Sequence, residues 1–172
     1  MPEIEVRPAT IHDAKTIADI HASAAQAAYR GLVADEQLDA MPMDKRIRHW
    51  RDAIEFADPQ VQVAVHEGLT IGFVGYDRSR DPKSKATTGE IWSIYLREAH
   101  WGQGAGVALW DAARDGLEEE GCTHVTVWVP LANERALRFF ELAGFKRELN
   151  TARTAQIGGV KLEELRLKRG IA

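Results

Sequence analysis

The chain has 172 residues, one cysteine and a formal net charge of −4, from 22 basic and 26 acidic side chains. The length fits a single domain over 1–172. The lone cysteine excludes an intrachain disulfide and a four-cysteine zinc site. We therefore expect no metal and a cytoplasmic location. Because the charges are interspersed and no apolar run reaches about 18–20 residues, we expect no nucleic-acid partner, no membrane and no signal peptide.

The first half of the chain predicts a strand, two helical regions and a hairpin. Thr10 and Asp13 form a capping-box pattern at the start of the first helix, and Pro42 is expected to divide the second region because it removes a helical hydrogen bond. Glu67-Gly68 is a turn signal between alternating apolar runs. The predicted elements are a strand at 3–7, a helix at about 11–28, a helical region at 35–56, and hairpin strands near 61–65 and 71–76.

The second half predicts strands that alternate with helices after a polar loop. Gly121 and Gly144 follow apolar stripes of helical period, where glycine commonly ends a helix. The predicted elements are a loop at 77–88, a strand at 90–96, a helix at 104–120, a strand at 123–129, a helix at 133–143, and short strands near 145–149 and 161–167. Since a hairpin and helical crossovers both occur, the pattern predicts an α/β fold with a mixed sheet.

A glycine-rich segment, residues 100–106, lies between a predicted strand and a predicted helix. Gly102, Gly104 and Gly106 let the backbone turn tightly, and the free N–H groups of the following helix carry partial positive charge. This combination predicts a pyrophosphate site. It lacks the Gly-Lys-Ser/Thr ending of a P-loop and the spacing of a dinucleotide-binding loop. The alternative interpretation is a plain turn from strand to helix.

The stretch 90–121 resembles the acetyl-CoA-binding motif of the GNAT superfamily of N-acetyltransferases. That motif runs from the fourth strand through Arg/Gln-x-x-Gly-x-Gly/Ala into a long helix, and this chain matches it from Gly104 onward. The stretch from Asn133 to Phe145 resembles the second conserved block of the family. The resemblance implies a GNAT-like fold, a central mixed β-sheet flanked by helices, over nearly the whole chain. It also implies acetyl-CoA as cosubstrate, and homodimers are common in the family.

The resemblance also implies which residues bind the coenzyme. The main chain of Ile94 to Leu96 would pair with the pantetheine arm, and an N–H near Leu96 would stabilise the oxyanion. Trp101 stands where the family has Arg or Gln, so a side-chain contact to phosphate is lost while the backbone amides remain. Asn133 is either a coenzyme contact or a helix N-cap, and both can hold. The implied set is Ile94, Tyr95, Leu96, Trp101, Gly102, Gln103, Gly104, Ala105, Gly106, Val107, Asn133 and Phe140.

Two side chains are candidates for proton transfer. The attacking amine must be neutral, and an alkylamine with a pKa near ~10.4 is mostly protonated at pH 7. Glu90 opens the strand where several family members carry a base, and the alternative is a solvated carboxylate at a strand start. Family members often protonate the departing thiolate with a tyrosine, but this chain has Phe140 there. Tyr95 or a water would take that role.

The acceptor is predicted to be a small-molecule primary amine that attacks acetyl-CoA directly in a ternary complex. Acidic residues outnumber basic ones over 35–58, which indicates either a cationic acceptor or an ordinary solvated helix face. Trp92 lines the site or fills the core, and Trp128 is a predicted core residue. His21 lies on an apolar helical stripe and is predicted to be a core histidine with its hydrogen bonds satisfied, rather than a catalyst. The alternatives are an acetyltransferase of protein N-termini or lysines, and a non-catalytic acyl-CoA-binding sensor or scaffold.

Overall fold

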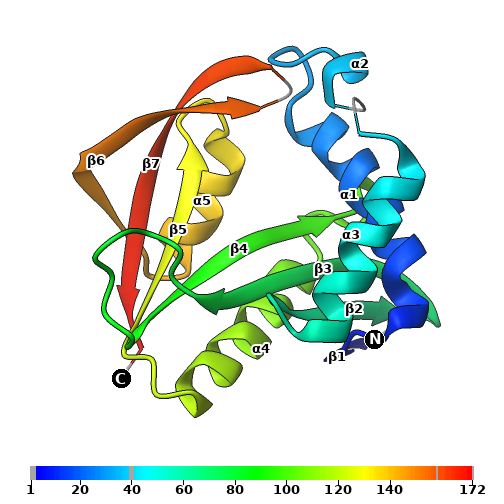
Figure 1. Cartoon of the computed structure of the whole chain (residues 1–172), viewed down its shortest axis with the longest axis horizontal. Helices are drawn as coiled ribbons and strands as arrows, with labels where there is room; N and C mark the ends of the chain where they lie inside the picture. Colours follow the sequence, from blue (N-terminus) through cyan, green and yellow to red (C-terminus); the bar gives the residue numbers. More distant parts are fainter. Residues whose placement is uncertain (1–2, 39–40, 158, 172) are drawn as a thin grey trace.

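The computed structural model describes residues 3–38, 41–157 and 159–171. Within them, helices pack on a twisted mixed sheet (Figure 1). In chain order the elements are β1 (Ile4–Pro8), the 3₁₀ turn η1 (Ile11–Asp13), α1 (Ala14–Ala28), α2 (Asp35–Leu38), α3 (Met43–Phe56), β2 (Gln60–His66), β3 (Leu69–Arg78), β4 (Thr88–Leu96), the 3₁₀ turn η2 (Glu98–His100), α4 (Ala105–Glu119), β5 (His124–Pro130), α5 (Glu134–Leu142), β6 (Lys146–Ile157) and β7 (Val160–Gly170).

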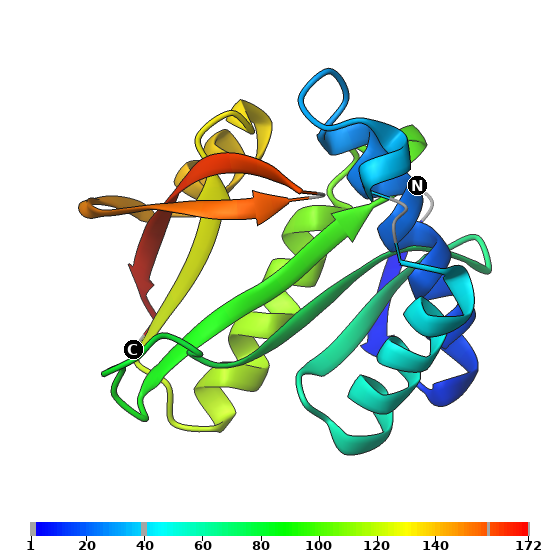
Figure 2. The ribbon, with the colours of Figure 1, turned by 45° about the horizontal axis from the view of Figure 1, so that its top comes forward.

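The sheet has the order β1-β2-β3-β4-β5-β7-β6. Among the described strands, only the central neighbours β4 and β5 pair in parallel, and α4 connects them as the crossover helix. Their pairing ends at Ile91 and Val127, although β4 continues to Leu96 and β5 to Pro130. The two strands therefore diverge at their C-terminal ends, as the ribbon shows (Figure 2). This divergence at the centre of the sheet creates space for a ligand.

Two hydrophobic cores hold the helices on opposite faces of the sheet. Leu109 and Leu117 of α4 and Phe140 of α5 pack with Val125 and Leu167 on one face. On the other face α1 and α3 pack on β2 and β3, in a core that includes Ile17, Ile20, Trp50, Val63 and Phe73. None of the described helices is both long and apolar enough to cross a membrane.

Most of the predicted elements are confirmed, and local sequence signals account for their boundaries. The Thr10 N–H donates to the Asp13 carboxylate at 2.8 Å, as the capping-box pattern predicts. Pro42 is the N-cap residue of α3 and separates α2 from α3. Gly68 has a φ of +79° in the hairpin turn. The predicted α/β fold with a mixed sheet is confirmed.

The prediction of two short C-terminal strands is wrong, because β6 and β7 form a long hairpin. Most β6 side chains are at least partly exposed and few are apolar, so the strand lacks the alternation that marks a half-buried strand. The far end of the hairpin packs against α1 and the segment that follows it. This third apolar cluster brings Ile157, Val160 and Leu162 against Ala25, Tyr29 and Val33.

Candidate active site

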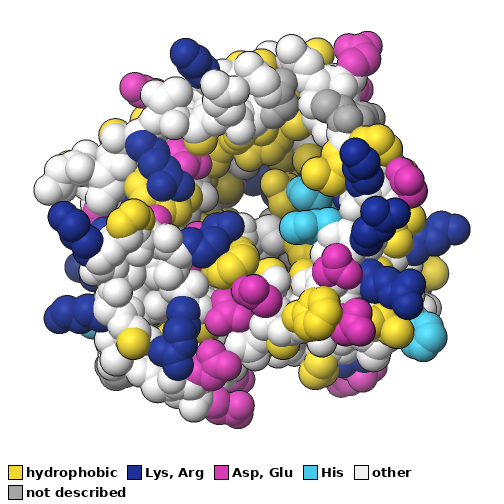
Figure 3. All heavy atoms as spheres, in the orientation of Figure 1, with side chains coloured by type: hydrophobic (Ala, Val, Ile, Leu, Met, Phe, Trp, Pro, Cys, Tyr) yellow, Lys and Arg dark blue, Asp and Glu magenta, His cyan; other side chains and the backbone are white. Residues whose placement is uncertain are grey.

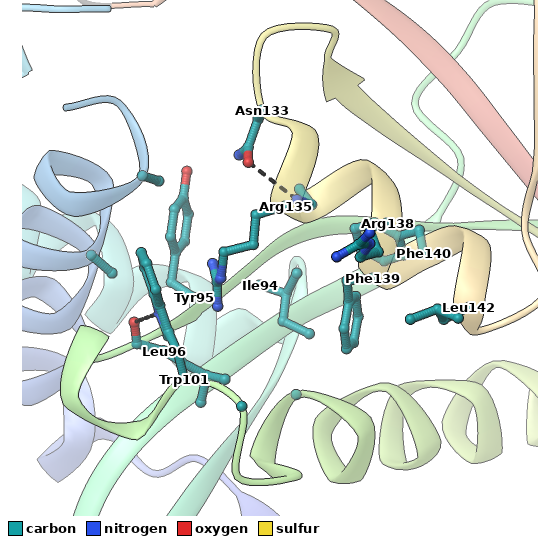
Figure 4. A pocket seen from close by; sticks show the side chains of 15 residues that line it. Ile94, Tyr95, Leu96, Trp101, Asn133, Arg135, Arg138, Phe139, Phe140 and Leu142 are labelled. Atoms are coloured by element: carbon teal, nitrogen blue, oxygen red, sulfur yellow. Dashed lines mark hydrogen bonds between the residues drawn. The ribbon is translucent and has the colours of Figure 1, made fainter. Parts of the chain in front are cut away.

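A cavity of about 290 Å³ opens where β4 and β5 diverge (Figure 4). Residues from the end of β4, from the glycine segment and from α5 line it. Of the residues that the sequence implied for the coenzyme, the cavity gathers Ile94, Tyr95, Leu96, Trp101, Gly102, Gly106, Asn133 and Phe140. Segments about 40 residues apart in sequence thus meet at one site, because α4 returns the chain beside β4.

The glycine segment makes the sharp turn that the sequence predicted. Gly102 has a φ of +75°, and Gly104, the N-cap residue of α4, has a φ of +91°. An L side chain rarely adopts these angles, so glycine fits both positions. The Ala108 N–H donates to the Gly104 carbonyl at 3.1 Å, so the N–H groups just before Ala108 belong to the unbonded first turn. They form a site of partial positive charge beside the cavity.

Gly106 has a packing role that its sequence position does not indicate. A Cβ atom at Gly106 would lie 3.0 Å from the Phe139 ring. A larger residue would therefore force the Phe139 ring of α5 to shift. Gln103, Gly104, Ala105 and Val107 do not line the cavity, and the Val107 side chain is exposed.

Trp101 and Arg135 form a stacked pair at the wall of the cavity. The Trp101 indole N–H donates to the Leu96 carbonyl at 3.0 Å, which fixes the ring against the end of β4. The Arg135 guanidinium lies 3.4 Å from the centre of that ring (Figure 4). Partial burial lowers the pKa of Arg135, and the negative charge of Glu98 opposes that shift. Glu98 is itself ion-paired with Arg30 at 3.1 Å. Arg135 thus presents a cation to the cavity, whereas the Trp101 indole is neutral.

Asn133 and Phe140 are held by α5. The Asn133 side-chain oxygen accepts the Ala136 N–H at 3.1 Å, so the N-cap interpretation is confirmed (Figure 4). Phe140 is buried and packs edge-on against Phe139 and Phe145. A phenylalanine ring there contributes apolar surface and no proton.

Tyr95 lies among aromatic side chains on the α1 side of β4. Burial raises the pKa of Tyr95, and a side-chain hydrogen bond with Tyr29 opposes that shift. The His21 ring is tilted against Tyr95, with 5.1 Å between the ring centres. Burial lowers the pKa of His21 to about 4, with further contributions from Arg46 and His49. The buried His21 Nδ1 has no hydrogen-bond partner among the described residues, so His21 is not the satisfied core histidine that was predicted.

Glu90 lies at the start of β4, where its side chain is only 1% exposed. Its Oε2 accepts from the Arg80 guanidinium at 2.6 Å, and its Oε1 accepts the Arg80 backbone N–H at 2.9 Å. Glu90 is therefore not the solvated carboxylate of the alternative interpretation. It also does not line the cavity at the end of β4.

The prediction that Trp128 fills the core is wrong. Trp128 is only partly buried, and its indole N–H donates to the Asp81 carboxylate at 3.0 Å. The Arg153 guanidinium covers its ring at 3.5 Å. The reason is tertiary: Asp81 arrives from the polar loop after β3, and Arg153 from the long strand β6.

Sequence reasoning missed several lining residues on α5, namely Arg135, Arg138, Phe139 and Leu142. A local signal existed for Arg135, which comes two residues after the N-cap and so belongs to the exposed first turn of the helix. No local signal distinguished the others from ordinary helix-surface residues.

The model of the acetyltransferase (GNAT) family matches residues 16–145 of this chain. Because the match covers more than half of the chain, the chain belongs to this family. The predicted class of enzyme, an acetyltransferase, is thereby confirmed.

Similar proteins are known from several bacteria. The chain is 27% identical over 165 residues to the N-acetyltransferase YuaI of Bacillus subtilis, covering 95% of this chain and 91% of the relative. It is 28% identical over 148 residues to an N-acetyltransferase of Mycobacterium tuberculosis, covering 85% and 90%.

Solved structures share the fold. The acetyltransferase yncA of Salmonella typhimurium, solved with its cofactor acetyl-CoA, has a TM-score of 0.74 at 21% identity and covers 98% of this chain and 94% of its own. The PaiA N-acetyltransferase of Thermoplasma acidophilum, solved with coenzyme A, has a TM-score of 0.75 at 18% identity and covers 98% and 99%.

Proposed function

We propose that this protein transfers the acetyl group of acetyl-CoA directly to the nitrogen of a small primary amine. The observation that carries the proposal is the cavity between the diverging strands, which joins the glycine segment, the end of β4 and the start of α5. Its glycine end offers helix N–H groups and Arg135 for phosphates. Its β4 edge no longer pairs with β5 after Ile91, so backbone groups there can pair with an extended pantetheine arm.

A contact at one end of the site favours a small molecule over a protein as acceptor. A groove open at both ends would favour a protein substrate. In this chain the far end of the β6–β7 hairpin packs on Tyr29 and Val33, close to Tyr95. That contact bridges the space above β4 at the α1 side, and the open hollow beside it is visible in the space-filling view (Figure 3).

Direct attack requires that the amine be neutral and that a proton donor serve the departing thiolate. We assign the donor role to Tyr95, whose raised pKa keeps the hydroxyl protonated throughout the neutral range. Glu90 is held by Arg80, which also stacks on Trp92 at 4.3 Å. We therefore propose that Glu90 positions Arg80 and Trp92 and accepts no proton itself.

Two measurements test this proposal. Isothermal titration with acetyl-CoA should show binding, and thiol release should follow when a primary amine is added. Tyr95→Phe should lower kcat and leave acetyl-CoA affinity unchanged. If the protein bound acetyl-CoA but acetylated no member of a broad amine panel, the enzymatic proposal would be replaced by a sensor role. Faster acetylation of peptide N-termini or lysines than of free amines would identify a protein acceptor.

A further inference from the structure

A second cavity, of about 120 Å³, adjoins the coenzyme cavity where β4 and β5 diverge. The two cavities share a wall formed by Ile94, Tyr95, Asn133, Ala136 and Phe140. The glycine segment lines only the first cavity, while residues of β5 and the middle of β4 line only the second. A molecule in the second cavity would therefore reach a thioester that lies at the shared wall.

The second cavity is aromatic and carries no charge on its lining. Its walls include Tyr29, Trp92, Tyr95 and Trp128, and none of the described lining residues is acidic or basic. The indole N–H groups already have partners, since Trp92 donates to the Arg78 carbonyl at 3.2 Å and Trp128 donates to Asp81. The cavity thus offers ring faces and edges to a ligand, and few hydrogen bonds.

Cations already occupy one face of each indole. Arg80 lies 4.3 Å from the Trp92 ring centre, and Arg153 lies 3.5 Å from that of Trp128. Carboxylates neutralise both guanidinium groups: Glu90 contacts Arg80 at 2.6 Å, and Glu164 contacts Arg153 at 2.7 Å. A polycationic acceptor would find no unpaired carboxylate on this lining and two guanidinium groups behind it.

The acidic stretch expected to attract a cationic acceptor does not take part. No described residue of 35–58 lines either cavity, because α2 and α3 lie beyond α1 and pack against it and β2. The sequence-based argument for a cationic acceptor therefore has no counterpart in the lining of the site.

We propose that the acceptor is a primary amine carried on an uncharged aromatic group, whose ring packs against Trp92 and Trp128. This inference rests on the proposed acetyl transfer and names its substrate class. The amine nitrogen attacks the thioester carbonyl carbon, the C–N bond forms, and the C–S bond breaks with its electron pair on sulfur. The nitrogen loses a proton to solvent and the thiolate gains one, so the products are an N-acetyl arylalkylamine and coenzyme A. Aromatic ring pairs prefer offset or edge-to-face contacts, which the partly buried indoles allow.

The test compares initial rates of thiol release for 2-phenylethylamine, tryptamine, ethylamine, spermidine and kanamycin. We expect kcat/KM to be at least tenfold higher for the two aromatic amines than for spermidine and kanamycin. Trp128→Ala should raise KM for 2-phenylethylamine about tenfold, should lower kcat/KM for ethylamine far less, and should leave the acetyl-CoA affinity unchanged. Trp128→Phe, which keeps a ring, should restore most of the loss.

Three outcomes separate the two proposals. Higher kcat/KM for spermidine or kanamycin would overturn the aromatic acceptor and keep acetyl transfer. Equal losses for 2-phenylethylamine and ethylamine in Trp128→Ala would show a structural role for Trp128 and overturn the assignment of this cavity. Absence of any amine-dependent thiol release would overturn acetyl transfer itself.

Discussion

Replacing Arg135 by alanine should weaken acetyl-CoA binding about tenfold and leave binding of a phosphate-free acetyl thioester unchanged. Arg135 stacks on Trp101 at 3.4 Å, and Trp101 is itself fixed by its bond to the Leu96 carbonyl. The guanidinium is thus oriented before the ligand arrives. In the position where the family motif supplies Arg or Gln, Trp101 acts as a platform for a cation from another helix.

The expected magnitude follows from the exposure and partners of Arg135. A hydrogen bond to a charged group contributes about 1.5–3 kcal/mol. Because Arg135 is exposed on its outer side, solvent screening favours the lower end, about 1.5 kcal/mol. That value corresponds to about a tenfold change in Kd. A phosphate contact should also weaken as ionic strength rises.

Isothermal titration of the native and variant proteins with acetyl-CoA and with S-acetyl-pantetheine measures the effect. Arg114→Ala is the matched control, because Arg114 is on α4 and pairs with Glu118 at 3.5 Å away from the cavity. Trp101→Leu, which removes the platform and keeps the cation, should give an intermediate loss. If Arg135→Ala weakened both ligands by the same factor, Arg135 would not be a phosphate contact and the reasoning would be refuted.

Three further variants test other parts of the site. Gly104→Glu should abolish acetyl-CoA binding, because it adds a negative charge at a φ of +91° beside the anion site; retained affinity in calorimetry would remove the glycine segment from the coenzyme site. Glu90→Gln should lower kcat/KM less than tenfold with an unchanged pH profile, and a loss above a hundredfold with an altered profile would make Glu90 the base. His21 has a pKa of about 4 in the native state and about 6.5 in the unfolded chain, so the unfolded chain binds a proton first as the pH drops. The free energy of unfolding should therefore fall by about 3 kcal/mol between pH 6.5 and pH 4. Urea unfolding of His21→Leu should show a smaller loss of unfolding free energy across that pH window than the native protein shows. An equal loss in the two proteins would contradict the argument.

Much of the fold could be predicted from the sequence because its signals are local. The Thr10–Asp13 capping box, the proline before α3 and the glycines that end α4 and α5 each act within a few residues. The glycine segment and the block after Asn133 likewise contain their information in short spacings. Their match to a family implied the mixed sheet, which the structure confirms.

The interactions of single side chains could not be predicted, because their partners come from distant segments. Glu90 resembled a free base in sequence, and only the return of the loop after β3 brings Arg80 to it. Trp128 looked like a core residue until Asp81 and Arg153 met it from two other elements. Arg135 stacks on Trp101 only because the fold places α5 across from it.

The sequence by itself determined the family, the helix and strand boundaries near strong signals, and the segment suited to phosphate, because each depends on backbone chemistry in one stretch of chain. Only the tertiary structure decided the shape and charge of the two cavities. The divergence of β4 from β5 opens the two adjoining cavities, and the end of the long β6–β7 hairpin packs against the segment after α1 beside them. Pocket shape and charge pairing are sums over contacts between segments far apart in sequence, so no local pattern encodes them.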